Sequence, residues 1–267
     1  MKRANVHHRL TSLILLAGLL CSVQLTAQRY RENKKNLDIV FIGNSITHGA
    51  TLKNPATEAP PVSTCVYLRG RPGMGKVQFS NQGVSGFTTV DFLPATGTAF
   101  EDVISAANGF AQDKGATLVF SIMLGTNDSA IKGPNGSPVS PDDYRLNLKA
   151  IIDRLLHDYP TCKIVVHNPI WYSPNTYNGA EYLQQGLTRL QGYFPEINTL
   201  LRYYTVSAPG QVFAGDKKAF RYFRKHHLDD YTPQKGHRGI FYLHPNKAGA
   251  VKLGIFWGKA IYKALEG

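Results

Sequence analysis

The stretch LDIVFIGNSIT, residues 37–47, decides the fold of this chain. Its first six residues are almost all apolar and end at Gly43, a pattern typical of a strand that is buried on both faces. Ser45 follows the strand where a helical turn is expected to begin. A hydroxyl there lies beside backbone N–H groups that can hold a developing negative charge, although a serine can also simply cap the helix.

Further short apolar runs alternate with stretches of helical spacing along the chain. The other expected strands are residues 77–80, 117–124, 163–167 and 211–214. The expected helices are residues 99–107, 141–157, 180–204 and 246–265, with Pro195 expected to kink or divide the third. This alternation predicts the α/β class: one three-layer α/β/α sandwich with a central parallel sheet of about five strands.

Residues able to do chemistry recur just after these strands, where ligands bind in open α/β sheets. Gly83 can present a backbone N–H, Asn127 can donate from its side-chain amide, and His244 precedes the last helix. Each alone could be a turn, a cap or a core residue. Together with Ser45 they supply a hydroxyl, a backbone donor, an amide donor and an imidazole, which are the parts needed for acyl transfer.

Four blocks in this order resemble the SGNH (GDSL) hydrolases: GNSIT at 43–47, the Gly83 block, GTND at 125–128 and HPN at 244–246. The resemblance runs from about residue 37 to the C-terminus. It implies the flavodoxin-like SGNH hydrolase fold and a serine esterase that needs no cofactor and no metal. Ser45 would be the nucleophile, His244 its base, and Ser45, Gly83 and Asn127 the oxyanion hole. Asn44 replaces the family's aspartate, as in carbohydrate-active members.

The residue that orients His244 is open, because Phe241 stands where the family has an aspartate. Phenylalanine cannot accept the Nδ1–H hydrogen bond that fixes the histidine tautomer. A backbone carbonyl near Phe241 could do so, or a carboxylate from Asp230, Asp229 or Asp216. We favour the backbone carbonyl, and a weakened or lost activity is the third alternative.

Two aromatic segments suggest contacts with glycans. Trp171, Tyr172 and Tyr177 follow the fourth strand and could stack on sugars at the rim of the site, or pack under their loop. Residues 217–225 mix cations and aromatic rings, either as a solvated basic face or as a contact for an anionic polysaccharide.

Residues 1–27 have the pattern of a secretory signal peptide, which leaves a single hydrolase domain at 28–267. Their removal takes away Lys2, Arg3 and Arg9 and no acidic residue, so the formal net charge falls from +12 to +9. We therefore expect a periplasmic or secreted protein with no stable membrane insertion. The chain has no recognisable nucleic-acid motif. Cys65 and Cys162 could pair or remain free.

The leading functional hypothesis is a carbohydrate O-acetylesterase, acting on acetylated carbohydrate or another small ester. The alternatives are a lipase or thioesterase with the same machinery, and a catalytically silent glycan-binding protein.

Overall fold

The central sheet contains five parallel strands in the order β2-β1-β3-β4-β5. The computed structural model describes residues 34–95, 98–110 and 112–266, so the expected signal peptide lies outside the described residues. The strands are β1 (Lys35–Gly43), β2 (Met74–Gly83), β3 (Ala116–Met123), β4 (Lys163–Val166) and β5 (Val212–Ala214). All five expected strands are therefore confirmed within a few residues of their predicted limits.

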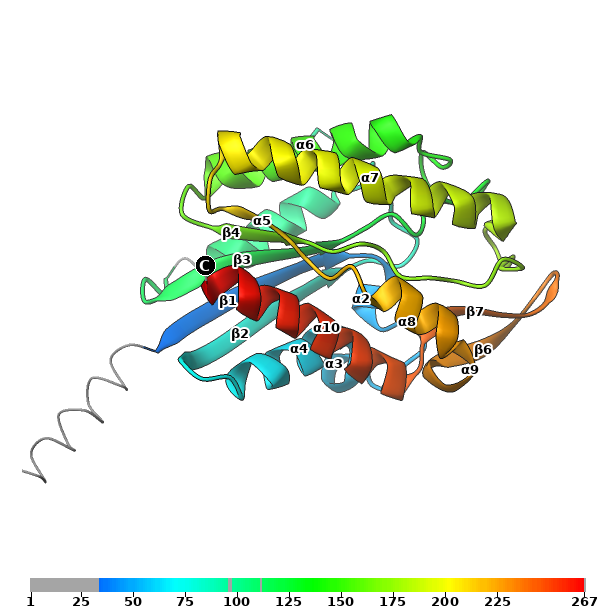
Figure 1. The fold of residues 1–267 in the computed structure, drawn as a ribbon, viewed down its shortest axis with the longest axis horizontal. Helices are drawn as coiled ribbons and strands as arrows, with labels where there is room; N and C mark the ends of the chain where they lie inside the picture. Colours follow the sequence, from blue (N-terminus) through cyan, green and yellow to red (C-terminus); the bar gives the residue numbers. More distant parts are fainter. Residues whose placement is uncertain (1–33, 96–97, 111, 267) are drawn as a thin grey trace, which may run out of the picture.

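Helices cover both faces of the sheet, which confirms the three-layer arrangement. In Figure 1, α6 and α7 lie over one face, and α4 and α10 lie over the other. The helices are α2 (Ser45–His48), α3 (Pro55–Glu58), α4 (Pro60–Arg69), α5 (Ala99–Phe110), α6 (Pro141–Asp158), α7 (Leu183–Ser207), α8 (Ala219–Lys225), α9 (His227–Asp230) and α10 (Lys247–Glu266). In the described part of the chain, no helix is both long and apolar enough to cross a bilayer.

The expected division of α7 at Pro195 is wrong, because the helix runs unbroken from Leu183 to Ser207. Proline removes one backbone hydrogen bond and crowds the preceding turn. Pro195 and Gln191 are both exposed, so the proline lies on the solvent side of the helix. The remaining length of α7 packs through buried residues before and after the proline.

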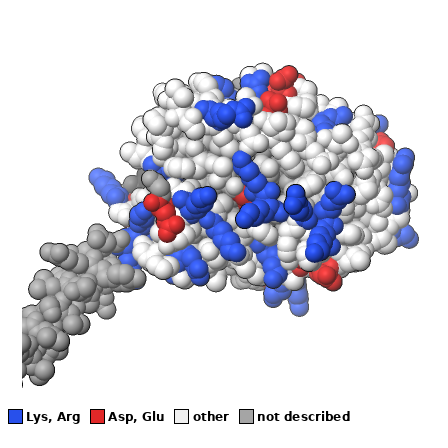
Figure 2. All heavy atoms as spheres, in the orientation of Figure 1, with Lys and Arg blue, Asp and Glu red and all other residues white. Residues whose placement is uncertain are grey.

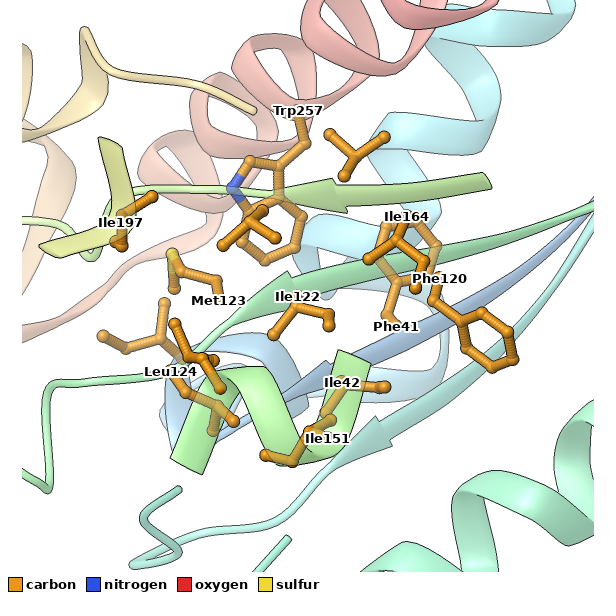
Figure 3. Packing of buried hydrophobic residues seen from close by; sticks show 14 of the residues in the cluster. Phe41, Ile42, Phe120, Ile122, Met123, Leu124, Ile151, Ile164, Ile197 and Trp257 are labelled. Atoms are coloured by element: carbon orange, nitrogen blue, oxygen red, sulfur yellow. The ribbon is translucent and has the colours of Figure 1, made fainter. Parts of the chain in front are cut away.

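The core is built from apolar side chains on both sides of the sheet. Figure 3 shows Trp257 of α10 on one side of the strands and Ile151 of α6 on the other. Trp257 stacks on Phe41 of β1 with ring centroids 5.9 Å apart. Because the last seven residues of β1 are all buried, the strand holds its C-terminal end, and the loop after it, in a fixed position.

Local signals explain where α6 begins. Ser140 caps the helix, and its hydroxyl accepts a hydrogen bond from the N–H of Asp143 at 3.1 Å. Pro141 occupies the first helical position, where no N–H is needed, and acidic residues in the first turn suit the positive end of the helix dipole.

A second, antiparallel sheet lies at the end of the molecule that also holds α2 (Figure 1). It is the hairpin of β6 (Tyr231–Gly236) and β7 (Gly239–Pro245), which the sequence reading missed. Tyr231 pairs with Pro245 and Pro233 with Tyr242, so β7 advances three residues where β6 advances two. This extra residue is a β-bulge beside His244, a feature that changes the direction of a side chain.

Both cysteines of the described chain, Cys65 and Cys162, are buried free thiols. Burial raises the pKa of each thiol to about 12. The thiols are therefore protonated packing groups, and no disulfide joins them.

Candidate active site

Ser45 is the first residue of α2, directly after β1. Asn44 caps this helix, because its side-chain oxygen accepts a hydrogen bond from the N–H of Ile46 at 3.1 Å. Gly43 is required by close packing, since a Cβ there would lie 2.0 Å from Oγ1 of Thr47. The turn leaves Ser45 8% exposed at the N-terminal end of a helix, where backbone N–H groups lack intrahelical partners.

His244 reaches Ser45 from the β6–β7 hairpin. Nε2 of His244 lies 2.9 Å from Oγ of Ser45, although 199 residues separate them in the chain. The imidazole is only 9% exposed. The structure therefore places the two residues that we expected to act together within hydrogen-bond distance.

The acceptor for the other ring nitrogen of His244 is the side chain of Gln234, in β6. Oε1 of Gln234 lies 2.8 Å from Nδ1 of His244. A carbonyl oxygen can only accept, so the proton sits on Nδ1 and Nε2 is left to accept from the serine hydroxyl. A neutral amide thus occupies the place that a carboxylate holds in a Ser–His–Asp triad.

This contact corrects the expectation for the orienting residue. Asp216 instead lies just before α8, where its carboxylate accepts from the backbone N–H groups of Lys218 and Ala219. The backbone carbonyl of Asp230 accepts from the N–H of Asn246 at 2.9 Å, and that of Asp229 accepts from the Asn246 amide at 2.7 Å.

The expected backbone carbonyl near Phe241 is also wrong as the partner of His244. Tyr242 directs its carbonyl to the N–H of Ser173 at 2.8 Å. The bulge beside His244 turns the imidazole toward the Gln234 side chain, so a side-chain acceptor takes the place of the carbonyl.

Asn127 lies in the same cavity as Ser45 and His244 and is 3% exposed. Its Nδ2 donates to the carbonyl of Phe87 at 2.8 Å, and its Oδ1 accepts from the hydroxyl of Tyr182 at 2.7 Å. These two contacts fix the orientation of the amide. An amide nitrogen carries two hydrogens, so one remains to donate to a substrate oxygen. Tyr182 was not predicted from the sequence.

Gly83 is arranged differently from the expectation. Its N–H donates to Oδ1 of Asn81 at 3.0 Å, and Gly83 is not among the residues that line the cavity. A glycine is required at this position because the backbone of α2 lies close to it: a Cβ would be 2.4 Å from the backbone nitrogen of His48. The structure thus pairs the Gly83 N–H internally and leaves Ser45 and Asn127 as the expected oxyanion donors in the cavity.

Asp128, next to Asn127, ties the loop after β3 to the loop after β2. Its Oδ1 accepts from the N–H of Thr89 at 2.8 Å and from the Thr89 hydroxyl. Burial raises the pKa of this carboxyl to about 6. These hydrogen bonds of Asp128 help to fix the position of the neighbouring Asn127, a role that the sequence did not indicate.

Of the two alternatives for the aromatic loop, packing is correct for Trp171 and Tyr172, which belong to the core, and the rim position is wrong for them. Tyr172 is fully buried, and its hydroxyl lies 2.9 Å from Oγ of Ser129. Trp171 is 6% exposed, and its carbonyl accepts from the hydroxyl of Tyr231 in the hairpin. Tyr177 packs against His237 with ring centroids 4.6 Å apart and does not line the cavity. The loop that contains Tyr177 packs on the hairpin and so helps to fix the position of His244.

The cavity around Ser45 has a volume of about 540 Å³. Its lining combines glycine, amide and hydroxyl groups with apolar side chains, and it carries one carboxylate, that of Asp91. The residues are Ser45, Ala50, Ser85, Gly86, Phe87, Asp91, Asn127, Gly133, Pro134, Asn135, Asn178, Gly179, Ala180, Tyr182, Leu243 and His244. Nowhere in the described chain do three His, Cys, Asp or Glu side chains group as metal ligands would.

Burial lowers the pKa of His244 from 6.5 to about 4. The neutral amide of Gln234 adds no charge that would oppose this effect. At neutral pH the imidazole is therefore uncharged and able to accept a proton from Ser45.

Replacing Gln234 by glutamate should move the acid limb of the pH profile upward by at least about one pH unit, because a nearby carboxylate favours the imidazolium. The acid limb of kcat/KM reports the pKa of the free base. At neutral pH we expect kcat to rise, since the charge stabilises the imidazolium formed during attack. The measurement is the kcat/KM profile of both proteins from pH 3 to 9.

The control is Gln234→Ala, which removes the acceptor without adding charge. It should lower kcat and leave the acid limb where it is in the natural protein. Superimposable pH profiles for Gln234→Glu and the natural protein would show that Gln234 does not act on His244.

Comparison with known proteins agrees with this architecture. Among curated proteins, none matches the chain. A carbohydrate acetylesterase, Est24 from Sinorhizobium meliloti, is similar in structure, with a TM-score of 0.57 and 17% identity over 85% of this chain and 99% of that one. A catalytic mutant of Axe2, an acetylxylan esterase from Geobacillus stearothermophilus, gives a TM-score of 0.58 with 18% identity over 88% and 96%. The M. smegmatis aryl esterase gives 0.57 with 17% over 85% and 99%.

Sequence comparison identifies the family itself. Residues 41–251 match the model of the GDSL-like lipase/acylhydrolase family, and this range runs from β1 through the hairpin into α10. The matched range includes Ser45, Asn127, Gln234 and His244. The chain belongs to the GDSL-like lipase/acylhydrolase family and is a carboxylic ester hydrolase.

Proposed function

We propose that this chain is a carbohydrate O-acetylesterase that works through an acyl intermediate on Ser45. The observation that carries the proposal is the set of polar side chains that line the cavity beside the Ser45–His244 pair, among apolar and small residues. Amides of Asn135 and Asn178 and the carboxylate of Asp91 line it together with small residues. Sugar hydroxyls need donors and acceptors of this kind, whereas a fatty acyl chain needs an apolar wall.

In the proposed reaction, His244 takes the proton of Ser45 through Nε2 while the serine oxygen attacks the ester carbonyl. Gln234 holds the Nδ1–H of the imidazole throughout. The negative charge on the carbonyl oxygen is held by the N–H of Ser45 and the side chain of Asn127. His244 then returns its proton to the departing sugar hydroxyl, and water, activated by the same base, releases acetate from Ser45.

A short acyl group fits the space around Ser45. A second hollow beside Ser45 and His244, which also reaches Leu52 and Pro60, has no room for a water molecule. It therefore offers no channel for a long acyl chain. Two structural neighbours, a carbohydrate acetylesterase and an acetylxylan esterase, support the same substrate class. The closed second hollow gives no support to the lipase or thioesterase alternative, and the Ser45–His244 contact disfavours a silent binding protein.

The decisive experiment compares nitrophenyl esters of two to eight acyl carbons with acetate release from acetylated polysaccharides. Each added methylene that must fit a closed pocket changes kcat/KM by about tenfold or more. We expect the acetyl ester to be the best small substrate and acetylated glycan to release acetate. A preference for long chains would establish the lipase or thioesterase alternative instead, and turnover no faster with the natural protein than with Ser45→Ala would leave only glycan binding.

We also propose that the protein is exported to the periplasm or beyond the cell. The support is the pattern of residues 1–27, with its basic start and apolar middle. N-terminal sequencing of the exported protein tests this, and Gln28 is the expected first residue.

A further inference from the structure

A strongly basic surface covers α8 and α10. Figure 2 shows Lys and Arg side chains gathered across this face, with few acidic ones among them. We call it the basic face and define it by exposed residues on α10 and on α8 with the turn before it: Lys252, Lys259, Lys263, Lys217, Lys218, Arg221, Arg224 and Lys225. Part of the face is the segment 217–225, which the sequence marked as mixed basic and aromatic.

The basic face contains a pocket of about 590 Å³ between the edge strand β5 and α10. Lys217 and Lys218 come from the turn after β5, and Lys259 and Lys263 lie one turn apart on α10. This pocket shares no lining residue with the cavity around Ser45. It is therefore a separate site and slightly larger than the catalytic one.

The four lysines of this pocket form no ion pair with a described carboxylate. Some cations elsewhere on the surface are paired: Arg145 with Glu196, Lys149 with Asp153, Arg154 with Asp158 and Lys247 with Glu58. Of the pocket lysines, Lys217 donates to Oδ1 of Asn198 at 2.5 Å, a neutral partner that fixes its position. Unpaired like charges repel one another, so four lysines in one pocket destabilise the folded protein unless a bound anion offsets the repulsion.

One carboxylate lies in the pocket, that of Asp216, against four lysines. Both of its oxygens accept from backbone N–H groups at the start of α8, at 3.1 Å and 2.7 Å. Asp216 is buried, with 7% of its surface exposed. The ammonium groups are exposed, so the pocket presents positive charge to solvent.

The remaining lining includes two half-buried aromatic rings, Phe213 of β5 and Phe256 of α10. Phe256 is held edge-to-face against Tyr222 of α8, with ring centroids 5.3 Å apart. A concave site with apolar rings and a few convergent charges suits a ligand that has flat apolar faces and anionic groups on the same unit. A uronic acid residue in a pyranose ring has this combination.

We propose that the pocket between β5 and α10 binds an acidic polysaccharide and holds it on the enzyme while acetyl groups are removed elsewhere. The carboxylates of the chain meet the pocket lysines, and sugar rings contact Phe213 and Phe256. The inference rests on the proposed function in one respect: the glycan substrate is what selects a polysaccharide from other polyanions. Binding outside the catalytic cavity raises the local concentration of acetyl groups at Ser45, as in other two-site binders.

The test measures binding of unacetylated polygalacturonate to the natural protein by isothermal titration at low salt. The variant Lys259→Glu/Lys263→Glu should weaken this binding by about tenfold or more. It replaces two attractions to the carboxylates of the polysaccharide with two repulsions. The matched control is Lys114→Glu/Arg202→Glu, which makes the same change of net charge at exposed residues that do not line the pocket. Both variants should keep the natural kcat/KM on a small acetyl ester.

Further ligands separate charge from sugar recognition. A neutral xylan should bind at least about tenfold more weakly, and binding of polygalacturonate should weaken as salt rises. Phe256→Ala should weaken binding of polygalacturonate but not of inorganic polyphosphate. Equal loss in the lysine variant and its control would overturn the proposal. Tighter binding of single-stranded DNA or of anionic vesicles would overturn it too.

The outcomes distinguish this site from the proposed activity. If the protein binds polygalacturonate through the pocket yet hydrolyses no acetyl ester, the proposed function fails and the binding site stands. If acetyl esters are hydrolysed and polygalacturonate does not bind, the pocket assignment fails alone.

Discussion

Ser45→Ala should reduce kcat/KM on an acetyl ester by between about 10⁴-fold and about 10⁶-fold, as loss of the nucleophile does in other serine hydrolases. Oγ of Ser45 is the atom that lies 2.9 Å from Nε2 of His244, and no other hydroxyl contacts this nitrogen in the described chain. Alanine keeps the backbone of α2 and the Asn44 cap, so the fold should survive. Steady-state kinetics with circular dichroism as a check on folding is the measurement.

Ser85→Ala is the matched control for this experiment. Ser85 is a second serine that lines the same cavity, whereas Nε2 of His244 is paired with Ser45. It should lose less than about tenfold, the scale of a single neutral hydrogen bond. Comparable losses in the two variants would remove Ser45 from its role as nucleophile.

Asn127→Ala should reduce kcat by about 10²-fold to 10³-fold, the effect of losing one oxyanion donor. The amide is held on two sides, by the carbonyl of Phe87 and the hydroxyl of Tyr182, so its free N–H is directed before substrate arrives. A donor that acts on the transition state changes kcat with little change in KM. Kinetics at saturating acetyl ester, with Tm measured beside it, tests this.

Two further variants serve as comparisons for Asn127→Ala. Tyr182→Phe keeps the ring but frees one side of the amide, so its loss of kcat should be smaller than that of Asn127→Ala. Asn135→Ala changes an amide farther along the cavity, whose Nδ2 donates to Asp91 at 2.9 Å, and should raise KM more than it lowers kcat. If Asn127→Ala changed KM alone, the residue would be a substrate contact and not an oxyanion donor.

The layers of the fold could be read from the sequence because each strand of the sheet is a continuous apolar run. The last seven residues of β1 and the last five of β3 are buried, and their nearly continuous apolar composition predicts this burial on both faces. The carboxyl ends of parallel strands meet at one edge, which is why Ser45 and Asn127 could be placed together. Local patterns sufficed for these elements.

The orienting residue could not be read in this way. Gln234 lies opposite Phe241 in the hairpin, and strict alternation would put His244, three residues later, on the other face. The bulge interrupts the alternation and brings the imidazole to the amide. The short loop between Gly236 and Gly239 was a signal for the hairpin, but no local pattern marks the extra residue. The aromatic loop was misplaced for a related reason, since its support of the hairpin depends on contacts distant in sequence.

The catalytic residues lie on two separate structural units, the central sheet and the hairpin. Ser45 and Asn127 are fixed to the central sheet, whereas His244 and Gln234 share β6 and β7 and keep their mutual geometry wherever that hairpin lies. Long-range contacts form late when a chain folds, and Ser45 and His244 are 199 residues apart. Turnover therefore requires the hairpin to be docked against the sheet, and we expect a refolding chain to regain activity only when Ser45 and His244 come within hydrogen-bond distance.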